Sequence, residues 1–173
     1  MVRFKSRYLL CELCVSERNS LQLLEERVIY HAVRAAVNRA HGDYGSAVCN
    51  IGFSVKYVNA HTGVVLLRCR KGHYRLIWSA LPFITGIESR GQRVQCFLNC
   101  LHVGGTIRTC QKFLVRYSTR QLHRMLLHCT SEAERREVRK AVMSFSLKKR
   151  REDGEEEEEE EEEDDGCGAG VDT

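Results

Sequence analysis

The chain has 173 residues, which is enough for one ordinary domain and a tail, and its net charge of +4 conceals a strong asymmetry. Residues 1–151 carry 27 cations against nine acids, a net charge of +18, whereas residues 152–173 carry 14 acids and no Lys or Arg. A body this basic favours a polyanionic partner, nucleic acid ahead of an anionic membrane surface, and the longest apolar stretch, 76–87, is too short to cross a bilayer.

The first forty residues predict a strand followed by a helix. Alternation over residues 2–13 is typical of a strand. One face, expected to be the outer one, begins with Arg3, Lys5 and Arg7, while Phe4, Tyr8 and Leu10 share the other face. The helix that follows is expected to be capped by Asn19 or Ser20, to carry an apolar stripe over 21–40, and to end at Gly42.

The middle of the chain predicts a hairpin, a short helix and one more strand. The expected elements are a strand over 47–57, a turn over 59–63, a strand over 64–70, a helix over 73–81 that stops at Pro82, a loop over 86–91 and a strand over 93–103. The second of these strands ends in Arg68, Arg70 and Lys71. Because it lacks the basic-glycine-aromatic pattern that stacks bases, contacts to nucleic acid are expected mainly at phosphate and sugar.

A glycine turn and a basic helix are predicted within residues 101–117, LHVGGTIRTCQKFLVRY. Gly104 and Gly105 allow a sharp turn close to a ligand, and Thr106 can cap the helix. The amides of the first turn and the helix dipole favour an anion, and cations recur along one helix edge at Arg108, Lys112 and Arg116. The alternative is a tight turn and a cap without a ligand. No P-loop or GxGxxG motif is present, so nucleotide hydrolysis is not expected.

Helical periodicity continues after this segment. The helix from Thr106 is expected to reach about Tyr117 and to continue through Leu126. Ser131 with Glu134 is typical of a capping box for a last helix. That helix would place Val138, Ala141, Val142 and Phe145 on its apolar side.

The predicted element order is β-α-β-β-α-β-α-α over a domain of residues 1–147, followed by a tail of residues 148–173. A split β-α-β unit with a hairpin inside it predicts an α+β fold, a ferredoxin-like or RRM-like α/β sandwich with helices packed on an antiparallel four-stranded sheet. The KKRR run at 148–151 is either a nuclear localisation patch or a solvated helix end, and the acidic tail after it is expected to be disordered.

Nine cysteines without a recognisable signal peptide predict reduced thiols in an intracellular protein. Cys11 with Cys14 and Cys96 with Cys100 could be zinc pairs, but both pairs fall in predicted strands, where alternate residues face opposite ways. Buried free cysteine is therefore favoured. The nine acids of the body are scattered and His102 stands alone beside the glycine turn, so neither a catalytic residue nor a metal site is expected.

Four blocks of sequence resemble one known family. They are MVRFKSRYLLCEL at 1–13, YVNAHTGVVLLRCRK at 57–71, WSALPFITGIESRG at 78–91 and LHVGGTIRTCQKFLVRY at 101–117. The resemblance is to Pop-five, the family of the small protein subunit shared by eukaryotic ribonuclease P and ribonuclease MRP. It is collinear over about residues 1–145, and the acidic end is similar to that of vertebrate members.

The resemblance implies a non-catalytic RNA-binding subunit of a ribozyme, located in the nucleus and nucleolus. In ribonuclease P the RNA and its bound Mg²⁺ remove the 5′ leader of precursor tRNA, and in ribonuclease MRP the related RNA cleaves precursor ribosomal RNA. The protein itself would bind no cofactor. The implied partners are these two RNAs, nearby precursor tRNA, a TIM-barrel-like protein subunit and other protein subunits of the same particle, with no membrane.

The expected RNA contacts combine the basic strand ends with the glycine turn and its helix. They are Arg3, Lys5, Arg7, Arg68, Arg70, Lys71, Gly104, Gly105, Thr106, Arg108, Thr109, Lys112 and Arg116, with Arg108 and Lys112 foremost. Two rival interpretations are a stand-alone protein or chaperone that binds structured RNA, and a zinc-dependent nuclease.

Overall fold

The computed structural model describes residues 4–23, 25–89, 91–128, 131–132, 135–137 and 139–140. The chain divides into two compact units, Met1–Cys110 and Gln111–Thr173. The predicted boundary between residues 147 and 148, the KKRR run and the acidic tail all lie outside the described residues.

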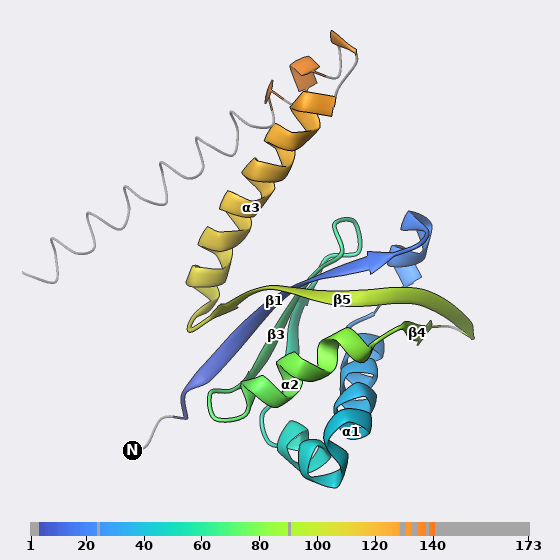
Figure 1. The fold of residues 1–173 in the computed structure, drawn as a ribbon, viewed down its shortest axis with the longest axis vertical. Helices are drawn as coiled ribbons and strands as arrows, with labels where there is room; N and C mark the ends of the chain where they lie inside the picture. The colour runs from blue at the N-terminus through green and yellow to red at the C-terminus, as the bar shows by residue number, and fades with distance from the viewer. Residues whose placement is uncertain are drawn as a thin grey trace, which may run out of the picture. The chain divides into compact units, whose positions relative to one another are not determined.

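The first unit is a mixture of strands and helices (Figure 1). Its elements are β1 (Ser6–Val15), the 3-10 helix η1 (Arg18–Leu23), α1 (Glu26–Asn50), β2 (Ser54–Val58), β3 (Val64–Arg70), α2 (Tyr74–Ala80), the 3-10 helix η2 (Leu81–Phe83), β4 (Gly86–Ser89) and β5 (Gln92–Gly104). The predicted helix caps Asn19 and Ser20 lie in η1 instead of at the start of α1. Helix α3 (Ile107–His128) begins in the first unit and continues into the second.

Five antiparallel strands form one sheet in the order β2-β3-β1-β5-β4. Strand β1 is central, and its Leu9 lies opposite Leu67 of β3 and Val103 of β5. Strand β3 separates β1 from β2, so the β1-α1-β2 unit is split as the sequence predicted. The α+β class is confirmed, but the prediction of four strands is wrong, because β4 adds a fifth strand at one edge.

The missed strand lies in the segment 86–91 that was expected to be a loop. Gly86 pairs with Gln95 and Ser89 with Gln92, and Gly91 turns the chain with a φ of +78°. Four residues between two glycines are too few to show a period in the sequence. This strand therefore owes its conformation to the neighbouring edge of β5 more than to its own residues.

Helix α1 begins later and ends later than the sequence predicted. Gly42 has a positive φ of +61°, which suits glycine, but with a ψ of −151° it kinks the helix, which continues to Asn50. Residues 47–50 are therefore helical, whereas the alternation of apolar residues predicted a strand there. Cys49, in this last helical segment, is buried in the core. A single buried apolar residue in four positions fits a helix as well as a strand, so the sequence could not distinguish the two.

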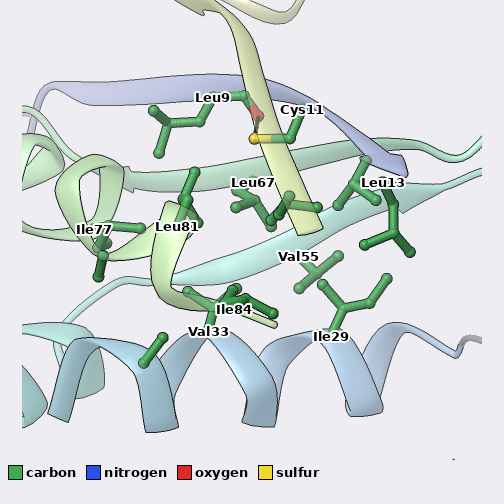
Figure 2. Close-up of a cluster of buried hydrophobic side chains, with 14 of the residues drawn as sticks. Leu9, Cys11, Leu13, Ile29, Val33, Val55, Leu67, Ile77, Leu81 and Ile84 are labelled. Atoms are coloured by element: carbon green, nitrogen blue, oxygen red, sulfur yellow. Dashed lines mark hydrogen bonds between the residues drawn. The ribbon is translucent and has the colours of Figure 1, made fainter. Parts of the chain in front are cut away.

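One face of the sheet packs against α1 and α2 to form the core (Figure 2). Leu9 and Leu67 are buried from the strands, Ile29 and Val33 from α1, and Ile77 from α2. Full burial of an aliphatic side chain of this size contributes about 1.5–3 kcal/mol. Packing on this face therefore stabilises the first unit and holds β1, β3 and β5 in fixed positions.

The two faces of β1 are reversed relative to the prediction. Arg7 shares its face with Leu9 and Leu13, which belong to the core, so it lies on the helix-covered side at the end of the strand. The alternation did not determine the core face because Leu9, Leu10 and Cys11 are all buried. A strand that is apolar on both sides carries no period of two.

The described part of the second unit is helical. Helix α3 runs beyond Tyr117, as predicted. The Arg135 amide donates to the Ser131 carbonyl at 3.1 Å, but Glu134 lies outside the described residues, as do all the named apolar positions of the last predicted helix. None of the helices that the structure describes is long and apolar enough to cross a membrane.

Cysteines behave as small apolar residues in the core. Burial raises the pKa of Cys69 to about 12 and that of Cys96 to about 11. Cys11 and Cys14 face opposite sides of β1. Cys96 and Cys100 are four positions apart on β5, a span of roughly 13 Å for a strand. Neither of these pairs can therefore close on one metal ion, whose thiolate ligands lie about 2.3 Å from it.

Replacing Gly63 tests the hairpin between β2 and β3. Gly63 has a φ of +72°, and a Cβ atom there would lie 2.6 Å from the Leu13 carbonyl oxygen. Gly63→Ala should lower the free energy of unfolding by about 1–3 kcal/mol, measured by urea denaturation. The control, Gly72→Ala, places its Cβ where no atom lies within 4 Å and should change that free energy by less than about 0.5 kcal/mol. Equal effects of the two variants would contradict this reading of the turn.

Thiol labelling tests the burial of the cysteines. At pH 8 the buried Cys69 and Cys96 thiols remain protonated, because their pKa values lie well above that pH. Mass spectrometry after iodoacetamide treatment of the native protein should find half-buried Cys14 labelled before Cys69 and Cys96, which should be labelled only after urea is added. Rapid native labelling of Cys69 would show that the sheet opens readily.

Candidate nucleic-acid interface

Thr106 caps helix α3, as the sequence predicted. Its hydroxyl oxygen accepts the Thr109 amide at 3.2 Å, and its own amide donates to Thr109 Oγ1 at 3.4 Å. The Thr109 hydroxyl also donates to the Thr106 carbonyl at 2.8 Å. This reciprocal arrangement is a capping box with Thr in the position of Glu or Gln. Both threonines are exposed, but their hydroxyls already serve the turn.

The two glycines of the turn have different roles. A Cβ on Gly104 would lie 2.5 Å from Thr109 Oγ1 and 2.7 Å from Cys110 Sγ, so this buried residue must be small to let the first helical turn pack against it. The sequence predicts that both glycines allow a sharp turn close to a ligand; at Gly104 the close neighbour is the first turn of α3 itself. Gly105, by contrast, is exposed, and its Cβ position is 3.2 Å from Nη1 of Arg7.

Arg7 reaches the glycine turn from the neighbouring strand. Tyr8 pairs with Gly104, which brings the start of β1 beside the end of β5. The Arg7 guanidinium group lies against Gly105 and one residue from the capping Thr106. The structure thus brings together three predicted site residues from segments nearly a hundred positions apart in the sequence.

The predicted row of cations is present on helix α3. Arg108 and Arg116 are exposed and Lys112 is half-buried. Their spacing of four residues places them along one edge of the helix. Arg108 belongs to the first compact unit together with the glycine turn, whereas Lys112 and Arg116 belong to the second.

A second group of cations lies where β1 begins and β3 ends. The Lys71 amide donates to the Lys5 carbonyl at 2.9 Å, so the backbones of these two predicted residues are hydrogen-bonded. Arg68 Nε donates to the Ser6 hydroxyl at 3.1 Å. Arg70 pairs with Ser6 in the sheet register. Lys5, Arg68, Arg70 and Lys71 are named here the strand-end cluster; predicted Arg3 lies outside the described residues.

Two residues of this region were not among the predicted site residues. The Arg70 guanidinium carbon lies 4.3 Å from the centre of the Phe4 ring, within the range of a cation–π contact. The Arg70 side chain also lies against Gly52, whose Cβ position is 3.3 Å from Arg70 Cγ and Nε. The sequence offers one indication for Phe4, an aromatic residue between two cations, but the approach of Gly52 depends on the tertiary fold.

Lysine and arginine side chains predominate in this region. Among the residues that the structure describes, no three His, Cys, Asp or Glu side chains lie close enough together to hold a metal. His102 is half-buried on β5 opposite Leu10. Arginine and lysine side chains held at fixed positions bind phosphate by charge and by donated hydrogen bonds.

Comparison with known proteins identifies the family. The model of the Rpp14/Pop5 family matches residues 7–115. The zebrafish (Danio rerio) ribonuclease P/MRP protein subunit POP5 is 69% identical over 149 residues, which cover 85% of this chain and 88% of that protein. The human protein of the same name is 57% identical over 142 residues, which cover 82% of this chain and 87% of that protein.

A solved structure, described as a cryo-EM structure of yeast ribonuclease MRP, contains a chain that superposes with a TM-score of 0.47 at 11% identity, covering 87% of this chain and 98% of that one. This similarity is too weak to carry an argument. The family model spans more than half of the sequence, and the zebrafish relative is highly identical over most of both chains. The chain therefore belongs to the Rpp14/Pop5 family.

Proposed function

We propose that this chain is a non-catalytic protein subunit of ribonuclease P and ribonuclease MRP that binds and braces their RNA. The names of its relatives support the subunit role. In this proposal the RNA and its Mg²⁺ remove the 5′ leader of precursor tRNA or cleave precursor ribosomal RNA. The protein supplies contacts that hold the RNA in its active shape.

The observation that carries the RNA-binding role is the convergence of cations from different segments on the ends of β1, β3 and β5. Arg7 lies against the glycine turn, and the strand-end cluster gathers four more cations around the start of the same strand. Phosphate groups recur along RNA at regular intervals, so a fixed group of cations can hold several of them together.

Each part of the proposed interface has a distinct role. At the glycine turn, Arg7 and Arg108 contribute guanidinium groups that can donate two hydrogen bonds to one phosphate. The helix dipole at the start of α3 adds a favourable field for the same anion. Lys112 and Arg116 supply further phosphate contacts on α3, and the strand-end cluster supplies others at the edge of the first unit.

The proposal includes partners and a location. A TIM-barrel-like subunit and other protein subunits of the particle would cover apolar surface that the RNA does not, precursor tRNA would lie nearby, and the particle would work in the nucleus and nucleolus. The protein would hold no metal ion of its own. This division of labour distinguishes the proposal from a zinc-dependent nuclease, in which the purified chain would both bind zinc and cleave RNA.

Removing two cations from α3 tests the phosphate contacts. Arg108→Ala/Lys112→Ala should weaken binding to the ribonuclease P RNA and lower the slope of log K against log salt by roughly two, about one for each lost contact. Fluorescence anisotropy over a range of KCl concentrations measures this slope. The control is Arg27→Ala/Lys56→Ala, which removes two exposed cations of α1 and β2 outside the proposed interface. If both double variants reduce the slope equally, the interface is misplaced; a circular dichroism melt checks that each remains folded.

Purification from cells tests the subunit role. The tagged full chain should copurify from nuclear extract with the two related RNAs and a fixed set of proteins, because a bracing subunit remains in its particle. Sequencing of the bound RNA and mass spectrometry of the bound proteins measure this. Recovery of many unrelated RNAs without fixed protein partners would favour a stand-alone RNA-binding protein or chaperone, and cleavage of precursor tRNA by the isolated chain would exclude a non-catalytic role.

A further inference from the structure

Phe4 is an exposed aromatic residue whose presence is not explained by burial in the core. Its side chain is 71% exposed, whereas Phe53 of the core is only 7% exposed. Phe4 nevertheless has a defined neighbour, because the Arg70 guanidinium group lies over its ring at 4.3 Å. The ring is therefore presented at the surface in a fixed setting and contributes little to the core.

Arg70 is held from two other directions. Arg70 pairs with Ser6 in the register of β1 and β3, and this pairing fixes the Arg70 backbone next to the start of β1. Its side chain lies against Gly52, which has a φ of +101° and no Cβ to obstruct it. Arg70 therefore gives up little additional side-chain freedom if a third group packs against the same surface.

The surroundings of the Phe4–Arg70 pair are strongly basic. Lys5 and Lys71 follow Phe4 and Arg70 directly in the sequence and are joined by a backbone hydrogen bond, while Arg68 lies two residues from Arg70 on the same face of β3 and donates to the Ser6 hydroxyl. The two chain segments that meet here, FKSR at 4–7 and RCRK at 68–71, contain no acid. An apolar protein surface would have to desolvate these charges, whereas a polyanion neutralises them.

We propose that the Phe4–Arg70 pair stacks an unpaired nucleobase of RNA, while Lys5, Arg68 and Lys71 hold the phosphates on either side. The inference rests on the proposed RNA-binding function and adds a base contact to an interface otherwise made of phosphate contacts. An aromatic ring and a guanidinium plane are the surfaces on which single-stranded bases stack. Bases inside a double helix are already stacked, so the partner at this point is a single-stranded segment.

The test uses the full-length chain and two short RNA oligonucleotides of equal length. One contains 2-aminopurine, whose fluorescence falls when the base stacks; the other contains abasic residues and so offers the same phosphates without bases. Phe4→Leu should weaken binding of the first RNA roughly tenfold or more and abolish its fluorescence change, because the aromatic surface on which the base stacks is lost. Affinity for the abasic strand and the salt slope should be unchanged.

Two further variants make the test specific. Phe4→Trp retains an aromatic surface and should retain the fluorescence change. Phe97→Leu removes another exposed phenylalanine, on β5 at the opposite end of β1, and should behave like the wild type. These variants separate loss of a stacking surface from loss of any exposed aromatic side chain.

Each outcome decides between the alternatives. If the wild type binds both RNAs and Phe4→Leu changes neither affinity nor fluorescence, the stacking inference is overturned and the phosphate interface stands. Equal weakening of both RNAs by Phe4→Leu also overturns it, because the ring then acts only by supporting the cations. If the wild type binds neither RNA with a measurable salt slope, the proposed RNA-binding function and this inference fail together.

Discussion

The pairing of β1 with both β3 and β5 is the constraint on which the rest of the structure depends. Tyr8 lies opposite Arg68 on one side and Gly104 on the other, so a single register places the basic end of β3 and the glycine turn beside the same few residues. The core enforces this register, because Leu9 must face the helices. A slip of one residue would move every side chain of β1 to the opposite face.

The same register explains why basic residues occur on both faces of the sheet at this end. Arg7 points to the helix-covered side and meets Gly105, while Arg68 and Arg70 lie on the other side and meet Ser6 and Phe4. Neither group extends into the middle of the sheet, where burial of unpaired charge would be costly. The ends of the strands therefore combine a closed core with a charged surface that a large polyanion can contact.

Sequence reasoning succeeded where local signals are strong. Strand β3 was predicted with its observed bounds, because an apolar run follows a turn in which the Asn59 side chain accepts the amides of His61 and Thr62. The cap at Thr106 was predicted because Thr106 directly precedes a segment whose apolar residues recur at helical spacing. The failures share one cause: β4, the continuation of α1 beyond Gly42, and the core face of β1 are decided by neighbours in space. The contact between Phe4 and Arg70 belongs to the same class, because only the register of β1 with β3 brings it about.

Fixed positions distinguish these cations from an equally charged flexible segment. A lysine or arginine on a disordered chain loses about 1.5–2 kcal/mol of side-chain freedom when a phosphate immobilises it. Arg68 is already hydrogen-bonded to Ser6, and Arg70 already lies against Phe4 and Gly52, so part of that cost is met when the protein folds. Cations in a fixed pattern also favour an RNA whose phosphates match their spacing, which selects a folded shape even without reading bases. In the proposed interface, binding strength and choice of RNA would therefore depend on the sheet remaining folded at this end, since fraying of β1 would release the cations from their pattern without removing a single charge.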